Sequence, residues 1–286
     1  MPLEIVGLVL LSALLHPLWN ALLKQGGQPE AGYLVLTFLI VVFAGGHALI
    51  AGHDLTSILT VWPLYLASTA GQLIYGFFLV LTLRRGDLSA YYPIIRSSPA
   101  FIVLFGFLVL GQRYSPFLLA GIALVLTGGF LLQYRPGLRL LDDPKTLACA
   151  VLAMTGVAIY SLADSRGVRQ IQPSVMFFWV EATCLLGYLF IFRLLGEHSV
   201  RWTALYLWLR RPLSNGAAGV MAYASYWLIL EAYRLGGDVA AVTSMRQASI
   251  PISVLIGGVL LREGAVFRRL GASLLLAAGI LSIVLS

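Results

Sequence analysis

Residues 88–110, LSAYYPIIRSSPAFIVLFGFLVL, form an apolar run of 23 residues that holds one charged side chain, Arg96. An α-helix rises 1.5 Å per residue, and the hydrocarbon core of a bilayer is about 30 Å thick, so about 20 apolar residues cross it. The run is long enough for such a crossing, and Arg84 and Arg85 precede it. We therefore expect a membrane-spanning helix here.

The rest of the chain repeats this pattern. Of its 286 residues, 59% are hydrophobic and 11% are charged, whereas an average soluble domain is about one quarter charged. The apolar runs do not alternate in polarity as barrel strands do, and backbone groups in hydrocarbon must pair within their own segment. These features predict an all-α, multi-pass membrane protein with ten transmembrane helices. The predicted helices are 3–23, 33–51, 58–83, 88–110, 116–134, 146–163, 174–195, 213–234, 239–261 and 267–285.

The formal charge of +7 does not indicate a nucleic-acid partner, because the basic residues lie in short connections between apolar runs. They concentrate in the odd-numbered connections, so the positive-inside rule predicts outward-facing termini in a plasma (inner) membrane protein. Cys149 and Cys184 fall within apolar runs, where small residues pack. We expect no metal site and no cofactor.

The second half of the sequence echoes the first at an offset near 150 residues. Arg96 matches Arg246 at that offset, and Tyr75 matches Tyr226 at 151. This repeat divides the chain into five-helix units at 1–134 and 146–286, joined by 135–145. Because five is odd, the two units would cross the membrane in opposite directions, an arrangement that places a solute site between them near the midplane.

The chain resembles the EamA-type family of the drug/metabolite transporter superfamily. The resemblance lies in the two five-helix repeats, in RRGDLSA at 84–90, and in LGQR at 110–113, where Gln112 replaces the family's acid. Pairs of glycines eight residues apart in the fifth and tenth helices complete the pattern: Gly121 with Gly129, and Gly271 with Gly279. The resemblance implies transport of a small organic solute. Some family members have cytoplasmic termini, so the orientation stays open.

Two arginines are predicted inside membrane-spanning helices, where charged side chains are costly and mark functional sites. Arg96 and Arg246 each lie about eight residues into their helices, near the midplane. Two guanidinium groups facing one cavity would suit a carboxylate, phosphate or phosphonate, which they bind bidentately. Alternatively, each arginine locks helices together through a nearby acid or backbone carbonyl, or lies near the membrane interface.

Prolines accompany both arginines. Pro93 and Pro99 flank Arg96, and Pro251 follows Arg246, so each helix loses backbone hydrogen bonds near its arginine. Freed carbonyls of this kind are tolerated where they line a cavity, and the alternative is a kink that serves only packing.

The first helix offers three further candidates for solute binding. His16 and Asn20 lie one turn apart on one face, with Trp19 nearby. His16 would line the site or couple a proton, and the alternative is that it binds the carbonyl freed by Pro17.

Glu181 is an acid well inside the seventh predicted helix. Our hypothesis is that it pairs with a buried arginine; a proton or a solute ammonium is the alternative ligand. Aromatic side chains on the third and eighth helices would enclose an apolar solute body, or else serve packing. They are Tyr75, Tyr223, Tyr226 and Trp227.

Together these features predict a secondary transporter, an exporter or exchanger, of a small organic anion or zwitterion such as an amino acid, an organic acid or a phospho- or phosphonate metabolite. The alternative is an exporter of lipophilic cations that uses Glu181 and the aromatics. A membrane enzyme or a non-transporting subunit is a minor alternative, because no H-E-x-x-H, G-x-S-x-G or nucleotide-binding loop is present. We therefore expect no catalytic residues. The partners expected are the solute, the lipid bilayer and possible homodimer contacts through the glycine-rich fifth and tenth helices.

Overall fold

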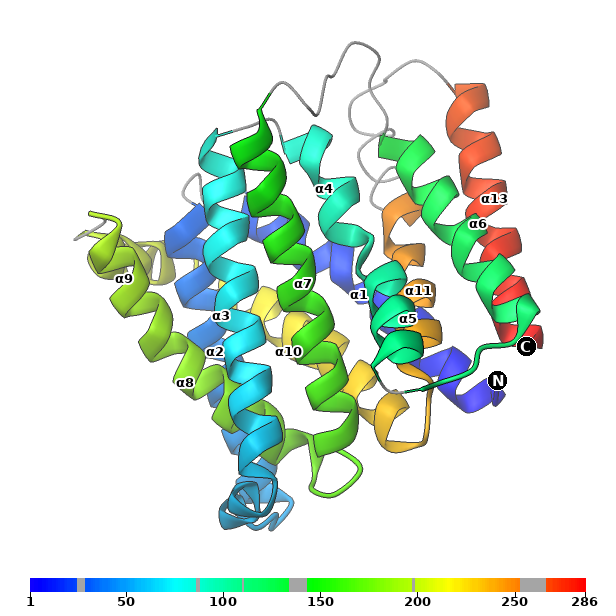
Figure 1. Ribbon diagram of the computed structural model, residues 1–286. Helices are drawn as coiled ribbons and strands as arrows, with labels where there is room; N and C mark the ends of the chain where they lie inside the picture. The colour runs from blue at the N-terminus through cyan, green and yellow to red at the C-terminus, as the bar shows by residue number, and fades with distance from the viewer. Residues whose placement is uncertain (25–28, 86–87, 110, 134–142, 197–198, 253–265) are drawn as a thin grey trace.

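The computed structural model describes residues 1–24, 29–85, 88–109, 111–133, 143–196, 199–252 and 266–286, and every regular element in these ranges is a helix (Figure 1). Among these residues, five helices are long and apolar enough to cross a membrane. The all-α prediction is confirmed, and the long apolar helices are compatible with a membrane protein. The elements are α1 (Leu3–Lys24), α2 (Pro29–Ile50), η1 (Leu55–Val61), α3 (Trp62–Arg85), α4 (Leu88–Arg96), α5 (Ser98–Leu108), α6 (Pro116–Gln133), α7 (Pro144–Gly167), α8 (Pro173–Leu194), α9 (Val200–Arg210), α10 (Pro212–Arg234), α11 (Val239–Met245), η3 (Arg246–Ala248) and α13 (Val266–Leu285).

The predicted helix 88–110 is divided into α4 and α5 at Ser97. Pro99 occupies the first turn of α5, where its missing N–H costs nothing. The Ala100 N–H bonds to the Ser97 carbonyl at 3.0 Å, so it does not continue the helical pattern to Arg96. The Arg96 carbonyl therefore does not receive the Ala100 N–H that a continuous helix would supply.

A second break lies at the other arginine. The α-helix that begins at Val239 ends at Met245, and the chain tightens into the 3₁₀ turn η3 at Arg246. The prediction of disturbed helices near both arginines is confirmed. The remainder of the predicted helix, 253–261, lies outside the described residues.

Helix α9 was not predicted, because residues 196–212 were interpreted as a connection. Its 11 residues span about 16 Å at 1.5 Å per residue, which is too short to cross a bilayer. Trp202, Tyr206 and Leu209 are exposed on it, and Arg201 and Arg210 lie against aromatic rings of the same helix. This amphipathic composition explains why a search for long apolar runs missed it.

Four long helix pairs build the bundle: α3 packs along α7, α1 along α10, α2 along α8, and α6 along α13. Glycines allow the closest approaches. A Cβ added at Gly156 would lie 2.6 Å from the Tyr75 nitrogen, and one added at Gly279 would lie 2.7 Å from the Gly121 carbonyl oxygen. Gly121 and Gly279 therefore serve close packing within one chain, as predicted for these residues.

Gly271 departs from that prediction. It is exposed, and a Cβ added there would meet no described atom within 4 Å. The helices α6 and α13 run antiparallel, so Gly121 faces Gly279 near the end of α13, while its sequence match Gly271 lies toward the beginning of the helix. A homodimer through these helices stays a prediction, and most of their glycines already pack within the chain.

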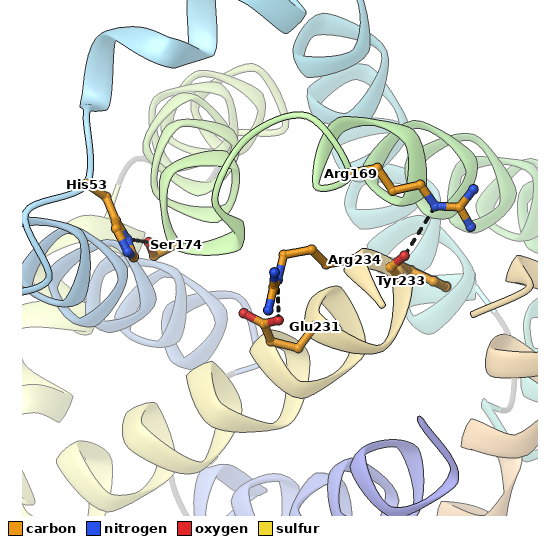
Figure 2. Close-up of polar contacts among 6 residues, drawn as sticks. All are labelled: His53, Arg169, Ser174, Glu231, Tyr233 and Arg234. Carbon is orange, nitrogen blue, oxygen red and sulfur yellow. Dashed lines mark hydrogen bonds and ion pairs between the residues drawn. The ribbon is translucent and has the colours of Figure 1, made fainter. Parts of the chain in front are cut away.

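The start of α11 is fixed by Arg169, which follows α7. Its guanidinium donates from Nε to the Tyr233 carbonyl at 3.2 Å (Figure 2). It also donates from Nη2 to the Gly237 carbonyl at 3.2 Å. The first carbonyl lies in the last turn of α10, and the second lies in the connection between α10 and α11. Arg169 thus holds the element that leads directly into Arg246.

Replacing Arg169 by methionine should lower the free energy of unfolding by about 1 kcal/mol, because both carbonyls lose a charged donor at an exposed position. Arg166→Met is the matched control, since Arg166 lies one turn earlier and is exposed as Arg169 is, but does not bond to these two carbonyls. Thermal unfolding of the purified variants measures the difference. Equal melting temperatures for the two variants would contradict the assigned role.

Candidate functional site

A small cavity of about 70 Å³ lies between the two helix breaks. Its walls come from α1, α3, α4, α5, α7, α11 and η3, so both halves of the sequence contribute. The lining residues are His16, Tyr75, Ile95, Arg96, Ser98, Val157, Tyr160, Ser161, Thr243, Arg246 and Gln247. Four predicted site residues, Arg96, Arg246, His16 and Tyr75, are therefore brought together.

The contact with the Arg96 side chain determines the protonation state and the tautomer of His16. The Arg96 Nη2 atom lies 3.1 Å from His16 Nε2, and because a guanidinium only donates, Nε2 must accept. His16 is then neutral and carries its proton on Nδ1, which is buried without a hydrogen-bond partner among the described residues. Protonation of Nε2 would replace this bond by a contact between two cations, which argues against a proton-coupling role.

Asn20 and Trp19 contact the His16 ring. The Asn20 Nδ2 atom lies 3.4 Å from His16 Nε2, and the Trp19 ring meets the imidazole edge-on at 4.9 Å between centres. Neither residue lines the cavity. Both hold the orientation of a lining side chain.

Arg246 forms no ion pair with a carboxylate in the described part of the chain. Its guanidinium carbon lies 5.1 Å from the centre of the Tyr226 ring, within range of a cation–π interaction. Its Nε atom is buried and lacks an acceptor among the described residues. This guanidinium is therefore held by an aromatic face and keeps donor capacity for a ligand.

Tyr226 links Arg246 to a buried acid. Its hydroxyl donates to Asp164 Oδ2 at 2.6 Å, and the Ser68 hydroxyl donates to Asp164 Oδ1 at 2.5 Å. Asp164 is 2% exposed and does not line the cavity. Since none of the described lining residues is acidic, the cavity wall itself carries two positive charges. Such a wall favours a negatively charged ligand.

Changing Tyr226 to phenylalanine should destabilise the protein by about 1–3 kcal/mol, because the ring under Arg246 remains but a buried Asp164 oxygen loses its donor. Tyr206→Phe, at an exposed position of α9, should leave stability unchanged. Thermal unfolding distinguishes these outcomes, and a neutral Tyr226→Phe would show that the Asp164 contact contributes nothing.

Tyr223 and Trp227 lie outside the cavity. The Tyr223 hydroxyl is 2.6 Å from His47 Nδ1, and the Trp227 ring lies 5.6 Å from the His47 ring. His53, 5.8 Å from His47, bonds through Nδ1 to the Ser174 hydroxyl (Figure 2). This cluster joins α2, α8 and α10 and is separate from the arginines.

Glu181 does not pair with either arginine, contrary to our hypothesis. It is 8% exposed and forms no ion pair in the described ranges. Cys184, one turn later, contacts the Thr69 carbonyl, so this face of α8 is directed at α3. The arginines lie on α4 and η3 instead.

Several lining residues were missed from the sequence. Ser98, Tyr160, Ser161, Thr243 and Gln247 are single polar side chains within apolar runs, a weak signal beside the arginines. Gln247 directly follows Arg246, and that position was the available clue. The described residues contain no group of three or more metal-binding side chains.

Comparisons with known proteins address the fold. No family model matches the chain, and no curated protein matches its sequence. One solved structure, described only as the crystal structure of a protein, is similar over 100% of this chain and 98% of its own, with a TM-score of 0.78 and 22% sequence identity. At this identity the likeness establishes the fold, which a solved protein shares over its whole length.

Proposed function

We propose that the protein is a secondary transporter, an exporter or exchanger, of a small organic anion or zwitterion in the plasma (inner) membrane. The observation that carries this proposal is the pair Arg96 and Arg246 on one cavity wall, whose described lining residues include no acid. Charged side chains within apolar helices are costly, so they are retained where they serve a function such as binding a charged ligand. The guanidinium fork matches a carboxylate, phosphate or phosphonate.

Both arginines are presented at helix breaks, as in transporters whose solute sites lie at interrupted helices. Backbone that leaves the helical pattern is tolerated at membrane depth where it lines a cavity. The breaks at Ser97 and η3 meet this condition, since Ser98, Arg246 and Gln247 line the cavity.

The proposed architecture is ten helices in two inverted five-helix repeats, 1–134 and 146–286, as in the EamA-type family that the sequence resembles. In these repeats, α1 of the first corresponds to α7 of the second, and α3 corresponds to α10. The packed pair α3–α7 therefore corresponds to the packed pair α10–α1. The pairs α2–α8 and α6–α13 each join a helix to its counterpart in the other repeat. The Met1 ammonium donates to the Val284 carbonyl at 2.7 Å, so the termini lie together, which is compatible with an even number of crossings. Alternating access would rock one repeat against the other.

A thermal-shift screen tests this function. Detergent-purified protein is heated with amino acids, organic acids, phosphonates or lipophilic cations, because a ligand that binds the folded state raises the melting temperature with concentration. We expect one or more acids or zwitterions to stabilise the protein and the cations not to do so. Stabilisation by lipophilic cations alone would contradict the proposal and favour the cation exporter.

A further inference from the structure

Gln247 has a fixed orientation that follows from the helix break at Ser97. Its side-chain nitrogen donates to the Arg96 carbonyl at 2.7 Å. That carbonyl can accept this bond because the Ala100 N–H bonds to Ser97 and does not continue the helical pattern to Arg96. Rotating the amide by half a turn would bring two oxygens together, so the nitrogen must face Arg96.

The other end of the same amide has no partner. Gln247 is 4% exposed and lines the cavity, and its Oε1 atom is buried without a hydrogen bond from any described residue. Two more cavity residues carry unpartnered buried atoms, Nδ1 of His16 and Nε of Arg246, and both of these are donors. The residues that line the cavity thus carry two donors and one fixed acceptor that lack a partner among the described residues.

Buried polar atoms in proteins are normally hydrogen-bonded, so these three atoms indicate the chemistry of a ligand that the cavity would bind. A plain carboxylate satisfies the two donors but offers nothing to Oε1, because an ionised acid only accepts. A ligand that satisfies all three atoms must also carry a hydroxyl or an amine.

We propose that Gln247 is a specificity-determining residue that accepts a hydrogen bond from a hydroxyl or amine of the bound acid. The substrate class is then a small hydroxy acid or amino acid rather than a simple carboxylic acid. This inference rests on the proposed function of the same cavity. A site built to bond a hydroxyl or an amine discriminates strongly against the analogue that lacks it, because its own polar atom is left unpaired.

Three matched sets of acids test the proposal. Each set shares a carbon skeleton and differs by the donor: propionate, lactate and alanine; succinate, malate and aspartate; 3-phenylpropionate, phenyllactate and phenylalanine. Dissociation constants are measured by titration calorimetry on detergent-purified protein. In at least one set, the hydroxy or amino member should bind about tenfold or more tightly than the plain acid. Comparing these two members shows which donor is preferred.

Two variants assign that preference to Gln247. Gln247→Met removes the acceptor and the bond to Arg96, whereas Gln247→Lys removes the acceptor and keeps a donor that can reach the Arg96 carbonyl. In both, the affinity ratio between the donor-bearing acid and the plain acid should fall toward one. A purely structural role would weaken all acids equally and leave the ratio unchanged.

The outcomes separate the two proposals. Plain and donor-bearing acids that bind wild-type protein equally would overturn the role of Gln247 and leave the anion site standing. A preference that persists in both variants would also overturn it. Binding of none of the nine acids, nor of any other acid in the thermal-shift screen, would count against the anion transporter itself.

Discussion

Replacing Arg246 by glutamine is expected to lower the affinity for the acid that gives the largest thermal shift by about 100-fold. Arg246 has no carboxylate partner in the described residues, and a charge-assisted bond contributes about 1.5–3 kcal/mol, so losing the guanidinium removes ligand contacts rather than an internal ion pair. Arg246→Lys keeps the charge but loses the planar fork, and its expected loss is about tenfold. Titration calorimetry measures both values.

Arg234→Gln provides the control for this prediction. Arg234 lies at the end of α10, where its Nε donates to Glu231 at 2.5 Å, and its side chain is 43% exposed (Figure 2). Exposed ion pairs contribute little, so this variant should bind the acid like the wild type. Equal affinities for wild type and Arg246→Gln would show that the guanidinium does not hold the ligand.

The second large effect is expected at Gly279, where leucine should destabilise the protein by about 3 kcal/mol or prevent its folding. Even a Cβ there would lie 2.7 Å from the Gly121 carbonyl oxygen and the Val125 nitrogen, so α6 and α13 would have to separate. Gly271→Leu is the matched control on the same helix, because Gly271 is exposed with open space around it.

Size-exclusion chromatography and thermal unfolding of both glycine variants provide the measurement. We expect Gly271→Leu to remain folded near the wild-type melting temperature. Similar losses of stability in the two variants would contradict the observed contacts. They would favour the sequence prediction, which assigned close packing to both Gly271 and Gly279.

The sequence was sufficient to predict an all-helical chain and the proximity of Arg96 and Arg246. Length and hydropathy locate most helices because the bilayer sets the length of an apolar run. The prolines beside Arg96 and Arg246 indicated the helix breaks, since a missing N–H disrupts the ladder whatever the neighbours are. The proximity of the two arginines was expected from the repeat, and both line one cavity.

Side-chain partners were harder to predict, because helical periodicity says which residues share a face but not which helix that face meets. Tyr223 and Trp227 share a face, yet they meet His47. Glu181 faces α3 rather than an arginine, as the contact of Cys184 with Thr69 indicates. The tautomer of His16 follows from a single contact across 80 residues of sequence.

Transport across a membrane tests the central claim most directly. Purified protein is reconstituted into liposomes, and uptake of the acid identified by the thermal-shift screen is followed in wild type, Arg96→Gln, Arg246→Gln and the control Arg234→Gln. We predict uptake in wild type and Arg234→Gln and loss of uptake in the two cavity variants. Binding without uptake in wild type, or uptake that survives in both cavity variants, would contradict a transporter that carries its solute on these two arginines.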